Sequence, residues 1–281
     1  MVQEQGRTLA ELLEADARGR IKEIYAELRR LSGVPIVALI FRHLATHVGL
    51  LDHIWLAVRP LMANGLLQDA AARVASENTP QGLIPPIDAN VRSAIDLDAD
   101  RVGPIVNAVE AYNRANAINL LVMLSLLQRV RLDRSLQQQL VPARVCRPPA
   151  PIAGPLSRMM SPSDMPPHIR RLINDLGFGN RTQLDPVVPS LLRHLCDAPG
   201  LLAVLHVILV PQFKDGTLRQ VVARLKSAMT HEATTLAPYI APLPQLMATP
   251  SALTVMEEFT DSWIPQMTVI GFALKRALGD V

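Results

Sequence analysis

Hydrophobic residues recur along much of the chain with the spacing of α-helices. Between Ile21 and Leu31, apolar residues occur at intervals of three and four, which places them on one side of a helix. Gly33 and Pro35 follow directly and predict the end of that helix. No segment shows sustained alternation of apolar and polar residues, and no convincing hairpin signal is present. The pattern therefore predicts an all-α protein.

Two runs are almost entirely apolar. They are residues 118–127 (INLLVMLSLL) and residues 201–210 (LLAVLHVILV). Both are well short of the roughly 20 residues that a membrane-spanning helix needs. We therefore predict that both runs form buried core helices.

An internal repeat is the clearest feature of the organisation. Residues 35–74 align without a gap with residues 186–225. The identical pairs include Arg42/Arg193, His43/His194, Leu44/Leu195, Gly49/Gly200, Leu50/Leu201, Leu51/Leu202, Pro60/Pro211 and Gly65/Gly216. With small shifts, residues 21–28 match 169–176, and 111–124 match 258–271. The alignment predicts two related helical units in one chain.

A proline-rich segment separates the two units. Eight of the 23 prolines lie between Pro142 and Pro167, a density that excludes regular helix or sheet there. We divide the chain into helical repeat one (1–130), a Pro-rich connector (131–168) and helical repeat two (169–281). Two such repeats most simply pack as a pseudo-twofold dimer within one chain, with a pocket between them.

Composition and charge narrow the class of protein further. Of 281 residues, 49% are hydrophobic and only 4% are aromatic, and the net charge is +3 without a clustered basic stripe. Such a chain is globular and lacks the surface of a nucleic-acid binder. The two cysteines, Cys146 and Cys196, form neither a metal-binding nor a C-x-x-C pattern. Together with a polar N-terminal segment unlike a signal peptide, this indicates a cytoplasmic protein.

Three asparagines fall within one predicted helix. Asn116 lies inside its apolar face, and Asn113 and Asn119 flank it at three-residue spacing. The apolar face consists of Ile105, Val109, Tyr112, Leu120, Met123 and Leu127. Because Asn is a poor helix former, three in seven residues need a reason. One interpretation is a polar lining in an apolar pocket. The other is hydrogen bonding between helices or exposure to solvent.

The Arg-His pair of each repeat raises a similar choice. His43 and His194 occupy matching positions and are predicted to point toward the core or the interface between repeats. His43 and His47 have a spacing that suits a metal, but no third ligand accompanies them, so we predict no metal site. Arg42 and Arg193 lie on the other side of their helices. They either serve a carboxylate substrate or form structural ion pairs and helix caps.

The segments GVPIVALIFRHLATHVGLLDHIW (33–55) and AYNRANAINLL (111–121) resemble the DehI family, the group I 2-haloacid dehalogenases. The resemblance extends over nearly the whole chain, including the two repeats and the connector. It implies an all-helical pseudo-dimer with its active site between the repeats. It further implies hydrolysis of the carbon–halogen bond of 2-haloalkanoic acids by direct attack of water, with neither a covalent intermediate nor a cofactor.

In that family an Asn and an Asp hold and activate the attacking water. The Asn corresponds to Asn116, and a second family Asn corresponds to Asn113. The position of the Asp is Leu191, and Ile36 stands where one family member has a tryptophan. Because leucine cannot accept a proton, our hypothesis is that His194 replaces the base, with His43 second. The competing hypothesis is that both imidazoles are packed core groups.

The residues and the resemblance together predict a set of site residues and an activity. The expected catalytic residues are Asn116, His194 and His43, and the expected substrate-binding residues are Asn113, Asn119, Ile36, Ile40, Leu191 and Tyr112. The expected activity is that of a 2-haloacid dehalogenase acting on a small carboxylic acid. The alternative is a homologue on the same scaffold that binds a small molecule or catalyses another reaction. We expect no nucleic-acid or membrane partner, and a homodimer stays open.

Overall fold

The structure is a computed structural model that describes residues 10–131, 138–142, 147–177, 188–243, 250–261 and 263–279. Its first half contains α1 (Gly19–Ser32), α2 (Leu39–Leu44), α3 (Leu50–Asn64), α4 (Leu66–Asn78), α5 (Ala89–Ala94) and α6 (Ala99–Arg131). Its second half contains η1 (Pro162–Asp164), α7 (Pro167–Leu176), α8 (Ser190–Leu195), α9 (Pro199–Lys214), α10 (Thr217–Leu236), η2 (Ala237–Tyr239), α11 (Pro250–Asp261) and α12 (Trp263–Leu278). These ranges contain helices and no strand, so the all-α prediction is confirmed.

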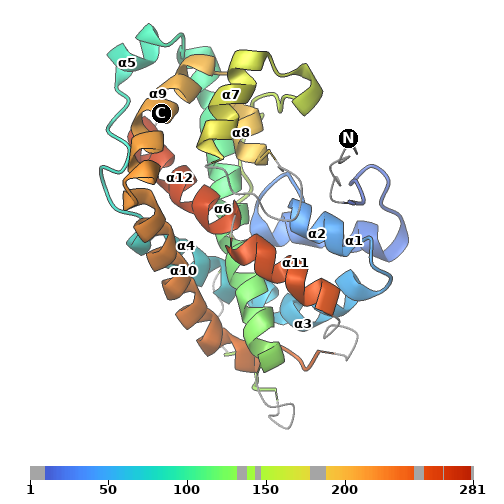
Figure 1. Ribbon diagram of the computed structural model, residues 1–281. Coiled ribbons are helices and arrows are strands. Elements are labelled where there is room, and N and C mark those ends of the chain that lie inside the picture. The colour runs from blue at the N-terminus through green and yellow to red at the C-terminus, as the bar shows by residue number, and fades with distance from the viewer. Residues whose placement is uncertain are drawn as a thin grey trace, which may run out of the picture.

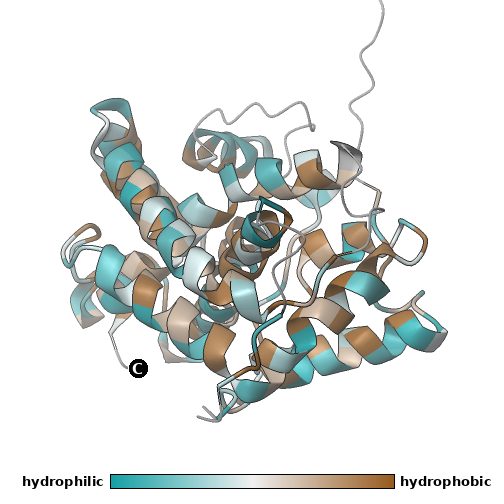
Figure 2. Ribbon diagram, turned by 90° about the horizontal axis from the view of Figure 1, so that it is seen from below, coloured by the Kyte–Doolittle hydropathy of each residue, from teal (hydrophilic) through white to brown (hydrophobic). Residues whose placement is uncertain are grey.

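The 33-residue helix α6 is the centre of the fold. It runs through the middle of the molecule, with α1, α2 and α3 on one side and α9 and α10 on the other (Figure 1). It packs against α12, α10, α4 and α11. Every residue of the apolar run 118–127 is buried, as predicted, because neighbouring helices surround this part of α6. Most of the other helices show a hydrophilic and a hydrophobic side (Figure 2).

The second apolar run behaves differently from the prediction. In α9, Leu201, Leu205 and Leu209 are fully buried, but Val207 on the other side is 72% exposed. The helix packs against α7, α10 and α8. The prediction of a core helix is therefore correct for one face of α9 and wrong for the other.

The two aligned segments contain the same succession of local structures. In each, a six-residue helix (α2 or α8) precedes a long helix (α3 or α9) with a proline inside it, Pro60 or Pro211. Gly65 and Gly216 follow with φ angles of 86° and 92°, a conformation that glycine adopts without strain. A further helix then begins, α4 or α10. Superposition of the two complete halves stays a prediction.

The connector packs along α6 and joins it to the end of α1. Ile152 N donates to Gly33 O at 3.2 Å, and Ser157 N donates to Pro104 O at 3.0 Å. The side chain of Arg114 donates to Ala150 O at 2.6 Å. The described part of the connector is therefore tied to the helices at several points, although it contains little regular structure itself.

The length and hydropathy of the helices bear on whether one of them could span a membrane. Within the described ranges, no helix by itself has both the length and the hydropathy to cross a bilayer. The segments Pro199–Lys214 and Thr217–Tyr239 reach these values only when taken together, across a bend of 81°.

Candidate functional site

A small pocket lies between the two halves of the chain, beside α6. Its volume is about 80 Å³, and its described lining comes from four places in the sequence. These are the segment before and within the start of α2, the middle of α6, the start of α8, and the α11–α12 region. The walls therefore combine both predicted repeats, and no single element forms the pocket.

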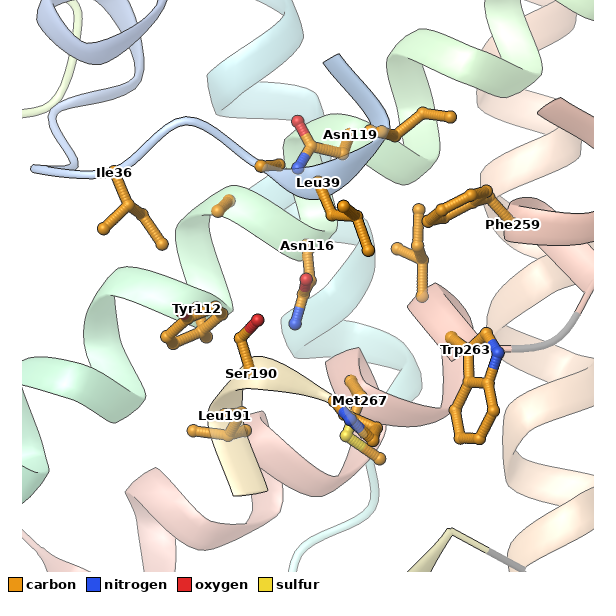
Figure 3. A pocket seen from close by; sticks show the side chains of 15 residues that line it. Ile36, Leu39, Tyr112, Asn116, Asn119, Ser190, Leu191, Phe259, Trp263 and Met267 are labelled. Carbon is orange, nitrogen blue, oxygen red and sulfur yellow. The ribbon is translucent and has the colours of Figure 1, made fainter. Parts of the chain in front are cut away.

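Helix α6 supplies most of the polar lining. Tyr112, Asn116 and Asn119 are four and three residues apart, so they follow one side of the helix into the pocket. The structure places Asn116 between α6 and the start of α8, with its amide near the Ser190 hydroxyl (Figure 3). Of the two interpretations of this residue, the structure thus favours the pocket lining.

The two sides of the pocket differ in chemistry. Tyr112 and Ser190 lie on one side, whereas Phe259 and Trp263 lie on the opposite side (Figure 3). In the alignment of the repeats, Phe259 and Trp263 stand at the positions of Tyr112 and Asn116, and Leu39 stands at that of Ser190. At each of these pairs one repeat carries a polar side chain and the other an apolar one. The difference gives the pocket a polar wall and an apolar wall.

Tyr112 and Ser190 form a hydrogen-bonded hydroxyl pair in the polar wall. Burial raises the pKa of the Tyr112 phenol, and the Ser190 hydroxyl and the charges of Arg42 and Arg193 only partly oppose that shift. The phenol therefore stays protonated at neutral pH and can donate a hydrogen bond to a ligand. Ser190 was not among the expected site residues. Its polar side chain opposite Leu39 in the repeat alignment was the available signal.

Of five further residues that were expected to bind substrate, four line the pocket and one does not. Ile36, Ile40, Leu191 and Asn119 line the pocket together with Asn116 and Tyr112. Leu191 is 1% exposed and is the second residue of α8. Asn113 does not line this pocket, although it was expected to bind substrate. Its Nδ2 atom donates to Gly271 O on α12 at 3.1 Å, so it joins two helices instead.

The two histidines expected as bases are not in the described lining either. His194 Nδ1 donates to Ser157 O at 2.6 Å, and His43 Nδ1 donates to Ala10 O at 2.7 Å. Each imidazole therefore donates a hydrogen bond to a backbone segment that lies outside its own helix, α8 for His194 and α2 for His43. His194 comes nearest to the site through its ring, which lies 5.5 Å from the Tyr112 ring. This placement favours the hypothesis of packed, hydrogen-bonded core groups.

The Arg-His pairs fasten two backbone segments, which we call the first strap (residues 10–12) and the second strap (157–160). Leu12 N donates to Arg42 O at 3.0 Å, and Met160 N donates to Arg193 O at 3.1 Å. The Arg42 guanidinium binds Glu11 at 2.6 Å, and that of Arg193 binds Met160 O at 2.9 Å. The repeated Arg-His motif therefore has the same structural task in both halves, and neither arginine lines the pocket.

The straps lead to a prediction about pH. Burial lowers the pKa of His43 and of His194 below the usual 6.5, so the folded state favours neutral imidazoles. Their stabilising contribution is complete above pH 6.5 and is lost as pH falls through the folded-state pKa values. Urea unfolding should show this loss between pH 7 and pH 5.

Replacing both histidines with asparagine keeps a hydrogen-bond donor at each position and removes the group that titrates. Asn can donate through Nδ2 where His donates through Nδ1. The double variant His43→Asn/His194→Asn should therefore lose less of its free energy of unfolding over the same pH range than the wild type does. Equal losses in both proteins would contradict this explanation.

Other reactive groups are scarce near the pocket. In the part of the chain that the structure describes, no three His, Cys, Asp or Glu side chains group closely enough to hold a metal ion. Cys196 is buried, and burial raises the pKa of its thiol to about 11, so it stays protonated. Cys146 lies outside the described residues. The described lining contains no carboxylate and no imidazole.

Comparison with known proteins finds likeness in structure only. No family model matches the chain, and no curated protein matches its sequence. A structure of a D-2-haloacid dehalogenase mutant in complex with D-2-CPA matches with a TM-score of 0.73 over 98% of this chain and 97% of that chain, at 16% identity. The fold is that of a haloacid dehalogenase.

Two further solved structures agree. A D-2-haloacid dehalogenase in complex with L-LA matches with a TM-score of 0.66 at 16% identity, over 96% of this chain and 97% of the other. Another mutant structure of this kind matches with a TM-score of 0.65 at 16% identity, over 96% and 92%. The expected dehalogenase fold is thereby confirmed. Membership of the DehI type stays a prediction.

Proposed function

We propose that this protein is a hydrolase of small 2-halocarboxylic acids, of the DehI type, that releases halide by direct attack of water. One observation carries the proposal. Asn116 lines a small pocket between the two halves of a haloacid dehalogenase fold, at the position where the resemblance places the water-holding asparagine. The alternative, a binding protein or an enzyme with another reaction, is kept as an outcome of the test.

The pocket suits a small acid with a compact body. Its volume is about 80 Å³, and its polar and apolar walls face each other. The Ser190 hydroxyl donates to the Tyr112 phenol, so the phenol proton is free to bind a carboxylate. Phe259, Trp263 and Leu39 can pack against the alkyl group and the halogen. A ligand bound in this way is held in one orientation, with C2 between the two walls.

In the proposed reaction, the water oxygen forms a bond to C2 while the carbon–halogen bond breaks. The halide leaves with the electron pair, and the product is a 2-hydroxy acid. Asn116 accepts a hydrogen bond from the water and holds it in line with the bond that breaks. The water must also lose one proton, and Leu191 cannot accept it. The proton passes to solvent water, because the described lining contains no carboxylate and no imidazole to retain it.

The absence of a carboxylate or imidazole from the described lining predicts a low turnover. General-base catalysis typically contributes roughly 10²–10⁴-fold to the rate. The test is halide release from a panel of 2-haloacids that includes both enantiomers of 2-chloropropionate. We expect slow release above the uncatalysed rate. If no member of the panel loses halide in the presence of the protein, the hydrolase proposal fails and the alternative takes its place.

The role of Asn116 gives a second prediction. The variant Asn116→Ala should release halide roughly 10- to 100-fold more slowly, because a hydrogen bond that positions the water is lost. Its unfolding midpoint should change little, since the residue faces a pocket. The control is Asn107→Ala, on the same helix but outside the lining, where Asn107 donates to Pro155 O. Equal activity in both variants would exclude Asn116 from the reaction.

A further inference from the structure

A second cavity lies on the opposite side of α6 from the pocket. Its volume is about 310 Å³, which is within the usual range for small-molecule sites. The walls come from α4, α6, α12 and the connector at Arg147 and Pro149. Residues Glu110, Arg114 and Ala117 of α6 face this cavity, whereas Tyr112 and Asn116 face the pocket. The two hollows are therefore separate.

The charged side chains that line this cavity carry a net positive charge. Glu110 binds Arg114 at 2.6 Å and Lys275 at 2.5 Å, so its carboxylate is shared between two cations. Asp69 also lines the cavity, and its neighbour Arg73 forms ion pairs with Glu232 and Glu77 instead. Within the described residues, Arg147 forms no ion pair or hydrogen bond, although it lines the same cavity. The described lining thus carries three cations (Arg114, Arg147 and Lys275) against two carboxylates (Glu110 and Asp69), an excess of one positive charge.

Most of the remaining wall is apolar. It consists of Ala72, Ala117, Ile118, Phe272 and Pro149, together with the buried amides of Gln68 and Asn113. Ile118 is buried, and Phe272 is partly exposed, so a flat or short aliphatic body can pack between them. An apolar wall beside a net positive charge, with the exposed guanidinium of Arg147 at the edge, suits an amphipathic monoanion. Glu110 and Asp69 would repel a second negative charge, which disfavours phosphate and dicarboxylates.

We propose that this second cavity binds a small monocarboxylate with an apolar body. The Arg147 guanidinium binds the carboxylate of the ligand, and the Phe272 ring packs against the hydrocarbon part of the ligand. The inference does not depend on the proposed function, because it concerns another face of α6. It also assigns a task to the connector, since the connector brings Arg147 to the cavity.

Calorimetric titration of the full chain with benzoate tests this proposal, with benzamide as the neutral probe of the same shape. The first variant, Arg147→Gln, removes the charge. The second variant, Ala72→Trp, fills the cavity from an exposed position on α4. The control is Arg158→Gln, which removes an exposed arginine of the same connector that does not line the cavity.

We expect benzoate to bind with a component that is about tenfold weaker in Arg147→Gln and absent in Ala72→Trp. Arg158→Gln should bind as the wild type does, and benzamide should bind at least tenfold more weakly than benzoate. The proposal is overturned if benzoate does not bind, if both cavity variants bind it unchanged, or if Arg158→Gln weakens it as much as Arg147→Gln. Halide release is measured separately, so this result and the test of the hydrolase proposal stay distinguishable.

Discussion

Replacing Leu191 with aspartate should raise the rate of halide release from 2-haloacids by roughly 10²–10⁴-fold. Leu191 lines the pocket beside Ser190 and is 1% exposed, so an aspartate there would place its carboxylate inside the cavity. Burial raises the pKa of a carboxyl group, which makes the ionised form a stronger base toward water. The new carboxylate would accept the proton that the present lining cannot keep, while Asn116 holds the water.

The control for this variant is Leu191→Asn, which has nearly the same shape as Leu191→Asp and no charge. It should release halide at about the wild-type rate. Both variants should lose about 1–3 kcal/mol of free energy of unfolding, because each buries a polar group in place of an apolar one. Halide release has to be compared at a temperature where both are folded. If the two variants have the same activity, the missing carboxylate does not limit this protein.

Replacing Gly271 with alanine should lower the free energy of unfolding by about 2–4 kcal/mol. A Cβ atom at this position would lie 2.0 Å from Asn113 Oδ1, well inside van der Waals contact. Asn113 is 2% exposed and donates to Gly271 O, so it cannot move aside without losing that hydrogen bond. The same Cβ would also touch Leu191 at 3.6 Å. Helices α6 and α12 approach closely here because residue 271 has no side chain.

Two control variants distinguish the clash between residue 271 and Asn113 from the general effect of a glycine-to-alanine change in a helix. Gly103 lies in α6 with no atom within 4 Å of its missing Cβ, so Gly103→Ala should stabilise the protein by about 0.5–1 kcal/mol. The double variant Gly271→Ala/Asn113→Ala should recover part of the loss, because the clash disappears with the amide. Chemical unfolding of the four proteins measures these changes. A Gly271→Ala variant as stable as Gly103→Ala would show that the helices can separate at little cost.

The pocket residues differ in how well sequence reasoning could find them. Asn116 was recognisable because a polar residue interrupts an apolar helical face, and the structure places it in the pocket. Asn113 precedes it by three residues, a rotation of about 60° around the helix axis. That rotation points it at the α12 backbone instead. A sequence shows that both residues face inward, but not whether a cavity or a helix lies opposite.

The histidines illustrate the same limit. His43 and His194 are buried, as their position in the apolar stripes predicted. Their partners are carbonyl groups of Ala10 and Ser157, which lie 33 and 37 residues away in the chain. Any backbone segment can offer a carbonyl group, so no sequence pattern marks these two in advance. Ser190 was not an expected site residue, because a serine at the start of a helix usually serves as a helix cap.

The sequence by itself determined the helical class, the buried centre of α6, and the glycine that ends α1. These features depend on local periodicity and on φ angles that only glycine adopts freely, so neighbouring residues suffice to predict them. Tertiary structure alone decided which inward-facing side chains reach the pocket and which face of α9 stays exposed. Both depend on packing between segments far apart in the chain, such as 36–40, 189–191 and 259–267, and a cavity exists only where these segments meet incompletely.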